Sequence, residues 1–274
     1  MIKSVTTRLK IKKTGREYLE SYLEYDVLGN EIFREVFSPE NFSSVKTVSS
    51  YDSKNRIVRK NVFKSGNSPV EVHKFFYNKS GDISNEEISQ EDSIKMIRTY
   101  FYTPGSLMKR TINGQEEELE RLVINYDGSH NVIEETMTDS SGVLSYHLTQ
   151  EYDHNNKLSC SCKFDCSGAQ IRKVTYTYNS LGLLEREKIE ENGRIIPLYN
   201  TYKYDGKNRE IFRVIGDLGN IETLYDDENH TVTEKRTSEQ GILMDTIVAV
   251  YDSQGLLLLR EDSSKLKTLK YEYF

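Results

Sequence analysis

The residues Tyr178-Asn179-Ser180-Leu181-Gly182 form a pattern that recurs along the chain. A tyrosine is followed by Asp or Asn, then by two variable residues, and then by Gly or Asn. Copies are often 26 residues apart, as Tyr25, Tyr51 and Tyr77 show. The tyrosines of this pattern are Tyr25, Tyr51, Tyr77, Tyr152, Tyr178, Tyr204, Tyr225 and Tyr251, with Tyr126 as a variant and Tyr102 as a degenerate copy. The chain is therefore a repeat array.

Each residue type in this pattern suits a hairpin turn. An Asp or Asn side chain at the first corner accepts a hydrogen bond from the backbone amide two residues later. Gly or Asn three residues after that corner suits a positive φ, which most other side chains resist. His130 holds this position in the variant copy, and histidine also tolerates it. The pattern predicts a type I turn followed by a left-handed residue, a common hairpin connection.

A second turn is expected halfway through each repeat, as at Asp139-Ser140-Ser141-Gly142. Asn113-Gly114 is instead typical of a tighter two-residue hairpin loop. Counting both kinds, together with a turn at Lys12, gives 21 turns and about 22 strands. No connection is long enough for a helical crossover, so neighbouring strands must be antiparallel. We predict an all-β fold, an antiparallel meander of about 22 strands built from 26-residue hairpin repeats and forming one coiled or curved sheet.

The unbroken period predicts a single repeat domain over residues 1–274. Hydrophobic residues are only 36% of the chain, so we expect a thin, tyrosine-rich sheet rather than a thick two-layer core. The pattern is weakest between Asp82 and Glu120. Ser84-Asn85-Glu86-Glu87 could open a short helix there, but the half-period and the β-rich stretch 94–102 favour strands.

The charge distribution limits the possible partners. A formal net charge of −6 without a basic stripe argues against nucleic acid. Basic residues do gather at the start of the chain, and they are a possible patch for an acidic partner. The favoured interpretation is an edge strand whose lysines prevent sheet extension. These residues are Lys3, Arg8, Lys10, Lys12, Lys13 and Arg16.

The sequence predicts a cytoplasmic protein without a membrane span. Residues 1–11 alternate between apolar and polar and therefore read as a strand rather than as a secretory signal. No stretch is long and apolar enough for a transmembrane helix. Three cysteines are an odd number, which fits a reducing compartment.

The cysteine cluster is the best candidate for a metal site. Zinc prefers four nitrogen or sulfur ligands at tetrahedral positions. Leu158 and Phe164 share a strand face with two of the cysteines, however, so these cysteines read as small core residues. We predict no metal and no cofactor. The residues considered are Cys160, Cys162 and Cys166, with His147 and His154.

Other catalytic signatures are missing from the sequence. It has no His-Glu-x-x-His pattern, no Gly-x-Ser-x-Gly elbow, no phosphate-binding loop and no dinucleotide fingerprint. Asp226-Asp227-Glu228-Asn229 is similar to a calcium loop but lacks the later Glu, so a turn is favoured. Carboxylates number 43, and two that face each other could hydrolyse glycosides, but no pair is marked by the sequence. We predict no catalytic, cofactor-binding or metal-binding residues.

The unit Tyr-Asp-x-x-Gly-x-Leu resembles the YD repeat of the RHS family. The resemblance spans nearly the whole chain, and the copies that carry it best are Tyr25 to Asn30, Tyr77 to Ile83, Tyr152 to Leu158, Tyr178 to Leu184 and Tyr251 to Leu257. Long members of that family coil a β-strip into a hollow shell around a toxic polypeptide. This chain has neither the Asp-Pro-x-Gly cleavage motif nor a non-repetitive C-terminal domain. The resemblance therefore implies the scaffold, without the encapsulating or toxic activity.

Three functions are compatible with these observations. The leading hypothesis is a non-enzymatic protein-binding module, specifically an immunity or antitoxin-type protein that binds a toxin domain. The second is a shell or surface component that assembles edge to edge through exposed first and last strands. The third is a carbohydrate-active enzyme, which requires a pocket lined by two facing carboxylates. The partner-binding residues are left unassigned.

Overall fold

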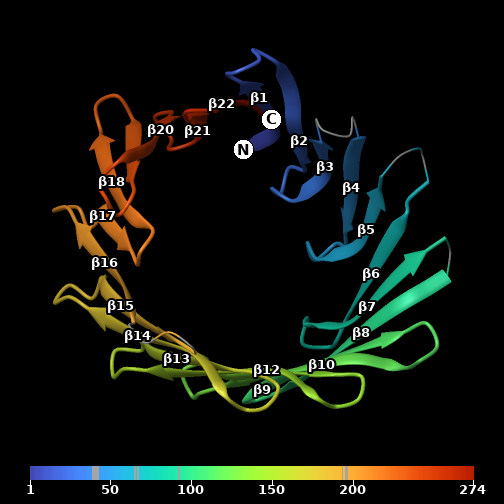
Figure 1. Cartoon of the computed structure of the whole chain (residues 1–274). Coiled ribbons are helices and arrows are strands. Elements are labelled where there is room, and N and C mark those ends of the chain that lie inside the picture. The colour runs from blue at the N-terminus through green and yellow to red at the C-terminus, as the bar shows by residue number, and fades with distance from the viewer. Residues whose placement is uncertain (39–42, 65, 67, 92, 193, 195–196) are drawn as a thin grey trace. The chain divides into compact units, whose positions relative to one another are not determined.

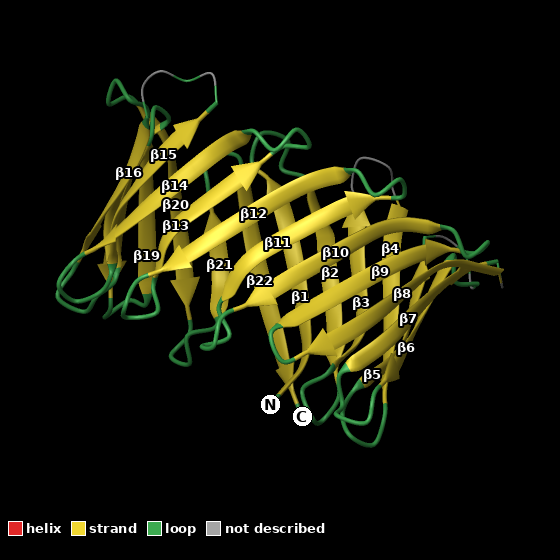
Figure 2. Cartoon of the chain, turned by 90° about the horizontal axis from the view of Figure 1, so that it is seen from below, coloured by secondary structure: helices red, strands yellow, loops and turns green. Residues whose placement is uncertain are grey.

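The structure, a computed structural model, describes residues 1–274 except 39–42, 65, 67, 92, 193 and 195–196. The described residues form strands and turns without a helix (Figure 2). Every strand pair with a determined register is antiparallel, so the predicted all-β antiparallel meander and its number of strands are confirmed. The strands are β1 (Ile2–Ile11), β2 (Glu17–Tyr25), β3 (Glu31–Ser38), β4 (Ser43–Tyr51), β5 (Ile57–Phe63), β6 (Glu71–Tyr77), β7 (Ile83–Gln90), β8 (Ser93–Thr103), β9 (Ser106–Asn113), β10 (Glu118–Tyr126), β11 (Val132–Asp139), β12 (Leu144–Tyr152), β13 (Leu158–Phe164), β14 (Gln170–Tyr178), β15 (Leu184–Glu191), β16 (Leu198–Tyr204), β17 (Glu210–Ile215), β18 (Gly219–Asp226), β19 (Thr231–Thr237), β20 (Leu243–Tyr251), β21 (Leu257–Glu261) and β22 (Lys265–Tyr273).

The chain divides into two compact units. Unit 1 contains Met1–Lys95, Thr223–Lys235 and Leu243–Phe274, and unit 2 contains Met96–Glu222 and Arg236–Ile242. In unit 2, each strand from β9 to β17 pairs with the strands before and after it in the sequence. This succession is the meander that the repeat predicts.

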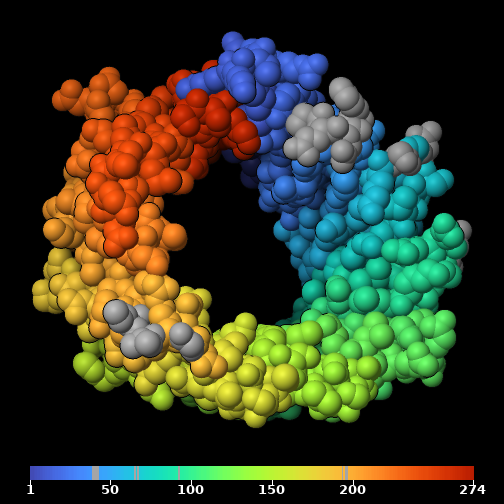
Figure 3. Space-filling model, viewed as in Figure 1, coloured from blue at the N-terminus to red at the C-terminus, as the bar shows by residue number. Residues whose placement is uncertain are grey.

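Unit 1 joins the two ends of the chain. Its sheet continues from β20 through β21 and β22 to β1, and then through β2 to β7. Strands β1 and β22 pair from Ile2 opposite Tyr273 to Ile11 opposite Lys265. Figure 3 shows these N- and C-terminal segments, blue and red, side by side, and Figure 1 shows β1 to β7 following a curve.

The pairing of β1 with β22 corrects two expectations. The first and last strands are not exposed edges, because β1 has a hydrogen-bonded neighbour on each side. The lysines of β1 therefore do not protect a free edge. A local repeat cannot reveal this pairing, since it joins residues more than 250 positions apart.

The turns have the geometry that their residue types predict. In the copy at Tyr178, the Asn179 Oδ1 accepts hydrogen bonds from the amides of Leu181 and Leu183, both at 3.0 Å. Gly182 has a φ of +77°, and the register shifts by one residue beside Tyr178. A positive φ is also found at the corresponding residues Gly29, Asn55, Gly81, His130, Asn156, Asn208 and Gly255.

Two turns differ from expectation. Asn113-Gly114 does not form a two-residue loop. Asn113 is instead the first residue of a longer turn, in which the positive φ falls on Glu116 and the amide of Asn113 donates to the carbonyl of Glu117. In the copy at Tyr225, the positive φ belongs to His230 rather than to Asn229. In both turns the side chain of the corner residue, Asn113 or Asp226, still accepts backbone hydrogen bonds.

The tyrosines link successive repeats. The hydroxyl of Tyr77 donates to the backbone carbonyl of Ile57 at 2.7 Å, 20 residues earlier. The same bond, also over 20 residues, is made by Tyr51, Tyr152, Tyr178 and Tyr204. Each tyrosine therefore ties the end of its strand to the residue that opens a strand of the preceding repeat, which explains why tyrosine is specified at this position.

The core is thin, as the composition predicts. The described hydrophobic residues that are buried are Leu9, Ile88, Val174, Ile189 and Ile247. Most of the remaining strand residues are half-buried or exposed. Backbone ladders and turn hydrogen bonds must therefore contribute a large share of the order, because little apolar surface is removed from water. The stretch that could have opened a helix at Ser84 lies in β7 and is a strand.

Candidate partner-binding site

The hairpin of β2 and β3 opens at one end. Its ladder runs from Tyr25 opposite Glu31 to Ser21 opposite Val36, whereas the corresponding hairpin of β14 and β15 stays paired as far as Arg172 opposite Glu191. Beyond Ser21, the described part of β2 is paired with β1 but not with β3. One edge of β2 thus has no described strand partner over residues 17–20.

A β-bulge explains why the two strands separate. Thr7 pairs with Ser21 and Arg8 pairs with Leu19, so Glu20 is an extra residue in β2. A bulge of this kind bends the strand and increases its twist. The Glu20 carboxylate reaches across β1 and forms an ion pair with Lys267 on β22, with 2.7 Å between the charged atoms. This ion pair holds the bulge in place. The bend directs the start of β2 away from the end of β3.

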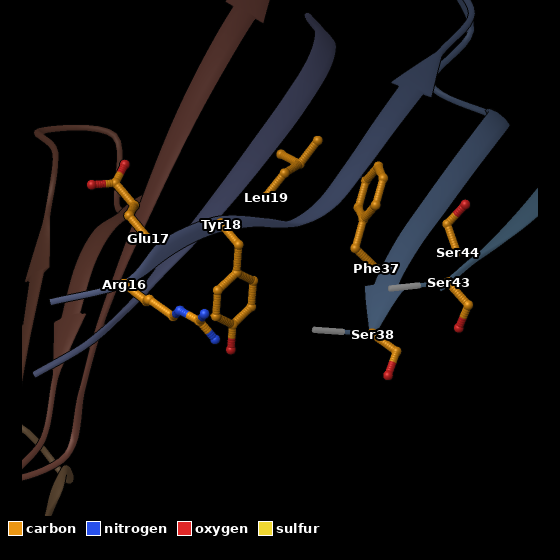
Figure 4. A pocket seen from close by; sticks show the side chains of 8 residues that line it. All are labelled: Arg16, Glu17, Tyr18, Leu19, Phe37, Ser38, Ser43 and Ser44. Atoms are coloured by element: carbon orange, nitrogen blue, oxygen red, sulfur yellow. The ribbon is translucent and has the colours of Figure 1, made fainter. Parts of the chain in front are cut away.

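A pocket of about 540 Å³ fills the opening (Figure 4). Adjacent residues of a strand point to opposite faces, yet Tyr18 and Leu19 both line this pocket, and so do Phe37 and Ser38. Figure 4 shows Leu19 and Phe37 on one side of the ribbons and Arg16 and Tyr18 on the other. The pocket therefore passes between the strands rather than lying on one face. Arg16, Glu17, Ser43 and Ser44 are the other described residues that line it.

The side chains around this opening combine apolar surface with positive charge. Val36 and Val45 are directly opposite each other on β3 and β4, and they are 42% and 43% exposed. Glu17 lies 3.6 Å from Arg8. Arg16 is exposed and makes no ion pair with another described residue. We call the residues 16–19, 36–38 and 43–45 the β2–β3 opening. Among the described residues that line it, Glu17 is the one carboxylate, so these residues do not provide the two facing carboxylates that a glycosidase requires.

A histidine between two carboxylates lies elsewhere in unit 1. The His73 Nδ1 is 2.7 Å from Glu86 Oε1, and its Nε2 is 2.6 Å from Glu71 Oε1. Glu86 is only 6% exposed. The hydrogen bond to Glu86 raises the pKa of His73 although burial opposes it, and the contact with Glu71 adds to the rise. The hydrogen bond from His73 lowers the pKa of Glu71. The two contacts therefore favour the protonated form of this largely buried imidazole between β6 and β7.

The cysteines and histidines considered as metal ligands make different contacts from one another. The Sγ atoms of Cys160 and Cys162 are 3.8 Å apart, and burial, together with Cys162, raises the pKa of Cys160 to about 11. His147 is bound by Glu134 at 2.9 Å, while Cys166 is exposed. Within the described ranges, no group of three or more His, Cys, Asp or Glu side chains is placed to hold a metal ion.

The remaining sequence candidates also have structural contacts. Asp226 forms a turn, in which its carboxylate accepts hydrogen bonds from the amide of Asn229 at 3.0 Å and from its side chain at 2.7 Å. His154 lies in a turn, where its Nε2 is 3.0 Å from the Nδ2 of Asn155. The sequence did not indicate the β2–β3 opening or the His73 cluster. A signal for the cluster was present in the alternation of Glu71 and His73 on one strand face.

An array of hairpins with Tyr-Asp turns defines the class of protein as a YD-repeat protein. Residues 15–267 match the profile of the teneurin YD-shell family. The chain therefore belongs to the teneurin YD-shell family, and the resemblance to YD repeats is confirmed. Among curated proteins, none matches the chain.

Three of the solved structures that match the chain share its sequence at low identity. A porin-like protein from Bacteroides uniformis aligns over 99% of this chain and 98% of its own, with a TM-score of 0.37 and 9% identity. A crystal structure of TcdB2-TccC3-Cdc42 aligns over 94% of this chain and 18% of that chain, with a TM-score of 0.25 and 10% identity. A protein of unknown function from Bacteroides fragilis covers 57% of this chain and 97% of its own, at a TM-score of 0.18 and 14% identity. Scores this low carry no argument about function.

The described part of the chain contains no helix with the length and apolar character needed to cross a membrane.

Proposed function

We propose that this chain is a non-enzymatic protein-binding repeat module, with residues 1–274 acting as one domain. The observation that carries the proposal is the β2–β3 opening, where unpaired strand edge, exposed apolar side chains and Arg16 adjoin one another. Aromatic and arginine side chains are enriched where protein partners contribute most binding energy. The tyrosine links between repeats make the surrounding sheet a stable platform for such a surface.

The specific role that we propose is that of an immunity or antitoxin-type protein, which binds a toxin domain. Its support is the family, since YD repeats occur in toxin systems, together with the acidic charge of −6. Co-expression with a toxin encoded beside this gene tests the role. Restored growth and co-purification of the toxin domain would support it, whereas growth arrest and no complex would contradict it.

The general proposal is tested by affinity capture with the full chain as bait, followed by binding measurements with each purified candidate. A partner that binds the isolated chain with a stoichiometry near one, by calorimetry, is the expected result. If none of the captured proteins binds the purified chain, the protein-binding function is wrong. Capture alone does not count as success, because exposed apolar side chains also retain proteins non-specifically.

A structural shell role is the second candidate, and membership in the YD-shell family favours it. Assembly by addition of strands to the chain ends is not available to it, since β1 and β22 pair with each other. Light scattering at rising protein concentration separates the two roles: a shell component forms larger assemblies, whereas a binding module keeps a constant mass.

We also propose a cytoplasmic location, supported by the three cysteines, none of which forms a disulfide. Fractionation of native cells tests it, and recovery of the chain outside the cytoplasm would reject it.

A further inference from the structure

We propose that the β2–β3 opening binds an extended segment of a partner protein, which adds as a strand to the free edge of β2 and carries an acidic residue two positions from an apolar one. This inference rests on the proposed protein-binding function and gives it a site and a ligand chemistry. The ligand is an acidic, extended peptide. Three properties of the opening lead to it.

The first property is the unpaired backbone. Residues Glu17 to Leu19 pair with Lys10 to Arg8 of β1 on one side. Because a strand presents amide and carbonyl groups on both edges, the other edge of these residues faces the opening without a described strand partner. Unpaired strand edges bind extended peptides through main-chain hydrogen bonds. Three or four residues of β2 offer roughly 10–13 Å of such edge.

The second property is the arrangement of side chains on the two faces. Arg16 and Tyr18 are two residues apart and project to the same side in Figure 4, together with Ser38 and Ser43. By alternation along β3 and β4, Val36 shares the face of Ser38, and Val45 shares that of Ser43. A peptide strand beside β2 would therefore place alternate side chains against Arg16 and against the apolar surface of Tyr18, Val36 and Val45.

The third property is the charge. Arg16 makes no ion pair with any residue in the described part of the chain. Two charged residues near it in the sequence are already engaged, Lys12 with Glu261 at 2.7 Å and Glu17 with Arg8 at 3.6 Å. Guanidinium groups bind carboxylates in a bidentate geometry. A peptide carboxylate opposite Arg16 supplies the missing partner, which accounts for the acidic residue two positions from the apolar one.

The test uses a random peptide library displayed on phage and selected on the intact chain. Selected peptides are then synthesised with a fluorescent label, and their affinities are measured by anisotropy. We expect enrichment of an Asp or Glu two positions from an apolar residue. Arg16→Glu should weaken binding of these peptides about tenfold, because it removes one ion pair and adds repulsion. Arg172→Glu, an exposed charge reversal on β14, is the matched control and should leave their affinities unchanged.

A second measurement separates strand addition from side-chain binding alone. N-methylation of alternate amides in a selected peptide removes donors from one edge without altering its side chains. Methylation on one of the two edges should weaken binding about tenfold or more, because several main-chain hydrogen bonds are lost. Circular dichroism of each protein variant confirms that it is folded.

Three results would overturn the inference: no acidic preference among selected peptides, equal affinity for the intact chain and Arg16→Glu, or indifference to methylation on both edges. Its failure can be distinguished from failure of the proposed function. A protein partner that binds the intact chain and Arg16→Glu equally would leave the protein-binding function standing and place its site elsewhere.

Discussion

The hydroxyl of Tyr178 donates a hydrogen bond to the backbone carbonyl of Leu158 at 2.7 Å, across 20 residues of sequence. Tyr178 ends β14, and Leu158 opens β13, so the bond ties the turn of one repeat to the turn before it. A second contact strengthens this link, since Lys157 lies with its Nζ 5.1 Å from the centre of the Tyr178 ring and 2.5 Å from the carbonyl oxygen of Gly182. Successive turns are therefore coupled, and their spacing is fixed by the reach of one tyrosine.

Replacing this tyrosine should measure the strength of the coupling. Tyr178→Phe removes the hydroxyl and leaves the Leu158 carbonyl without that donor, at an expected cost of about 1 kcal/mol in the free energy of unfolding. Urea denaturation followed by circular dichroism gives the value. Tyr199→Phe is the matched control, because that side chain is 43% exposed and makes no hydrogen bond through its hydroxyl to a described residue. Equal effects of the two substitutions would show that the link does not stabilise the fold.

The turn aspartates predict a loss of stability in acid. Hydrogen bonds from the amides of Lys157 and Asn155 lower the pKa of Asp153, although desolvation opposes the shift. A carboxyl with a depressed pKa in the folded state adds stability above its unfolded pKa, about 3.9, and this stability is lost as the pH falls through the folded pKa. The same direction holds at Asp52, Asp127 and Asp205. Unfolding free energy should therefore decline below about pH 4.

The contribution of one turn can be isolated because the chain supplies its own alternative. Asn179 occupies the corner in the copy at Tyr178 and makes the same two backbone contacts without a charge. Asp153→Asn should therefore keep the two backbone hydrogen bonds, lose the extra stability that the carboxylate charge gives at neutral pH, and reduce the acid-induced decline. Denaturation midpoints from pH 2 to pH 7 test this. An unchanged acid decline in the variant would show that Asp153 does not contribute to it.

His73 predicts a pH dependence of the opposite sign. Its pKa is raised mainly by the hydrogen bond to Glu86, with Glu71 adding to the shift. The protonated form adds stability that is fully present below the unfolded pKa of about 6.5 and is lost as the pH rises through the folded pKa. His73→Gln should remove this loss between neutral and mildly alkaline pH. A normal or lowered pKa for His73 in an NMR titration would contradict the prediction, and His154→Gln in an exposed turn is the control.

Local chemistry made the turns predictable, and distant contacts made the rest unpredictable. The pattern around Tyr178 identifies Asn179 as the first residue of the turn and Gly182 as its left-handed residue. The number and the direction of the strands follow from such turns. The residues near β1 do not indicate that β22 is its partner. A regular repeat does not show whether the first and last strands of the array pair with each other. The β2–β3 opening depends on the extra residue Glu20, which is identified only when β1 and β2 are aligned across the sheet. The Glu116 turn was missed because Asn113-Gly114 is a stronger local signal than the one the structure uses.

Gly219 gives the sharpest test of the packing in unit 2. Its φ is +121°, and a Cβ on this residue would lie 2.0 Å from the carbonyl oxygen of Thr237 and 2.8 Å from the carbonyl carbon of Ser238. Both clashes are with backbone, which cannot rotate away. Gly219→Ala should therefore lower the free energy of unfolding by roughly 3 kcal/mol or more. The matched control is Gly142→Ala, where φ is +80° but nothing lies within 4 Å of the added carbon. That change should cost only about 1 kcal/mol, from the backbone conformation alone. Equal losses for the two variants in urea denaturation would mean that β18 does not approach residues 237 and 238 as closely as described.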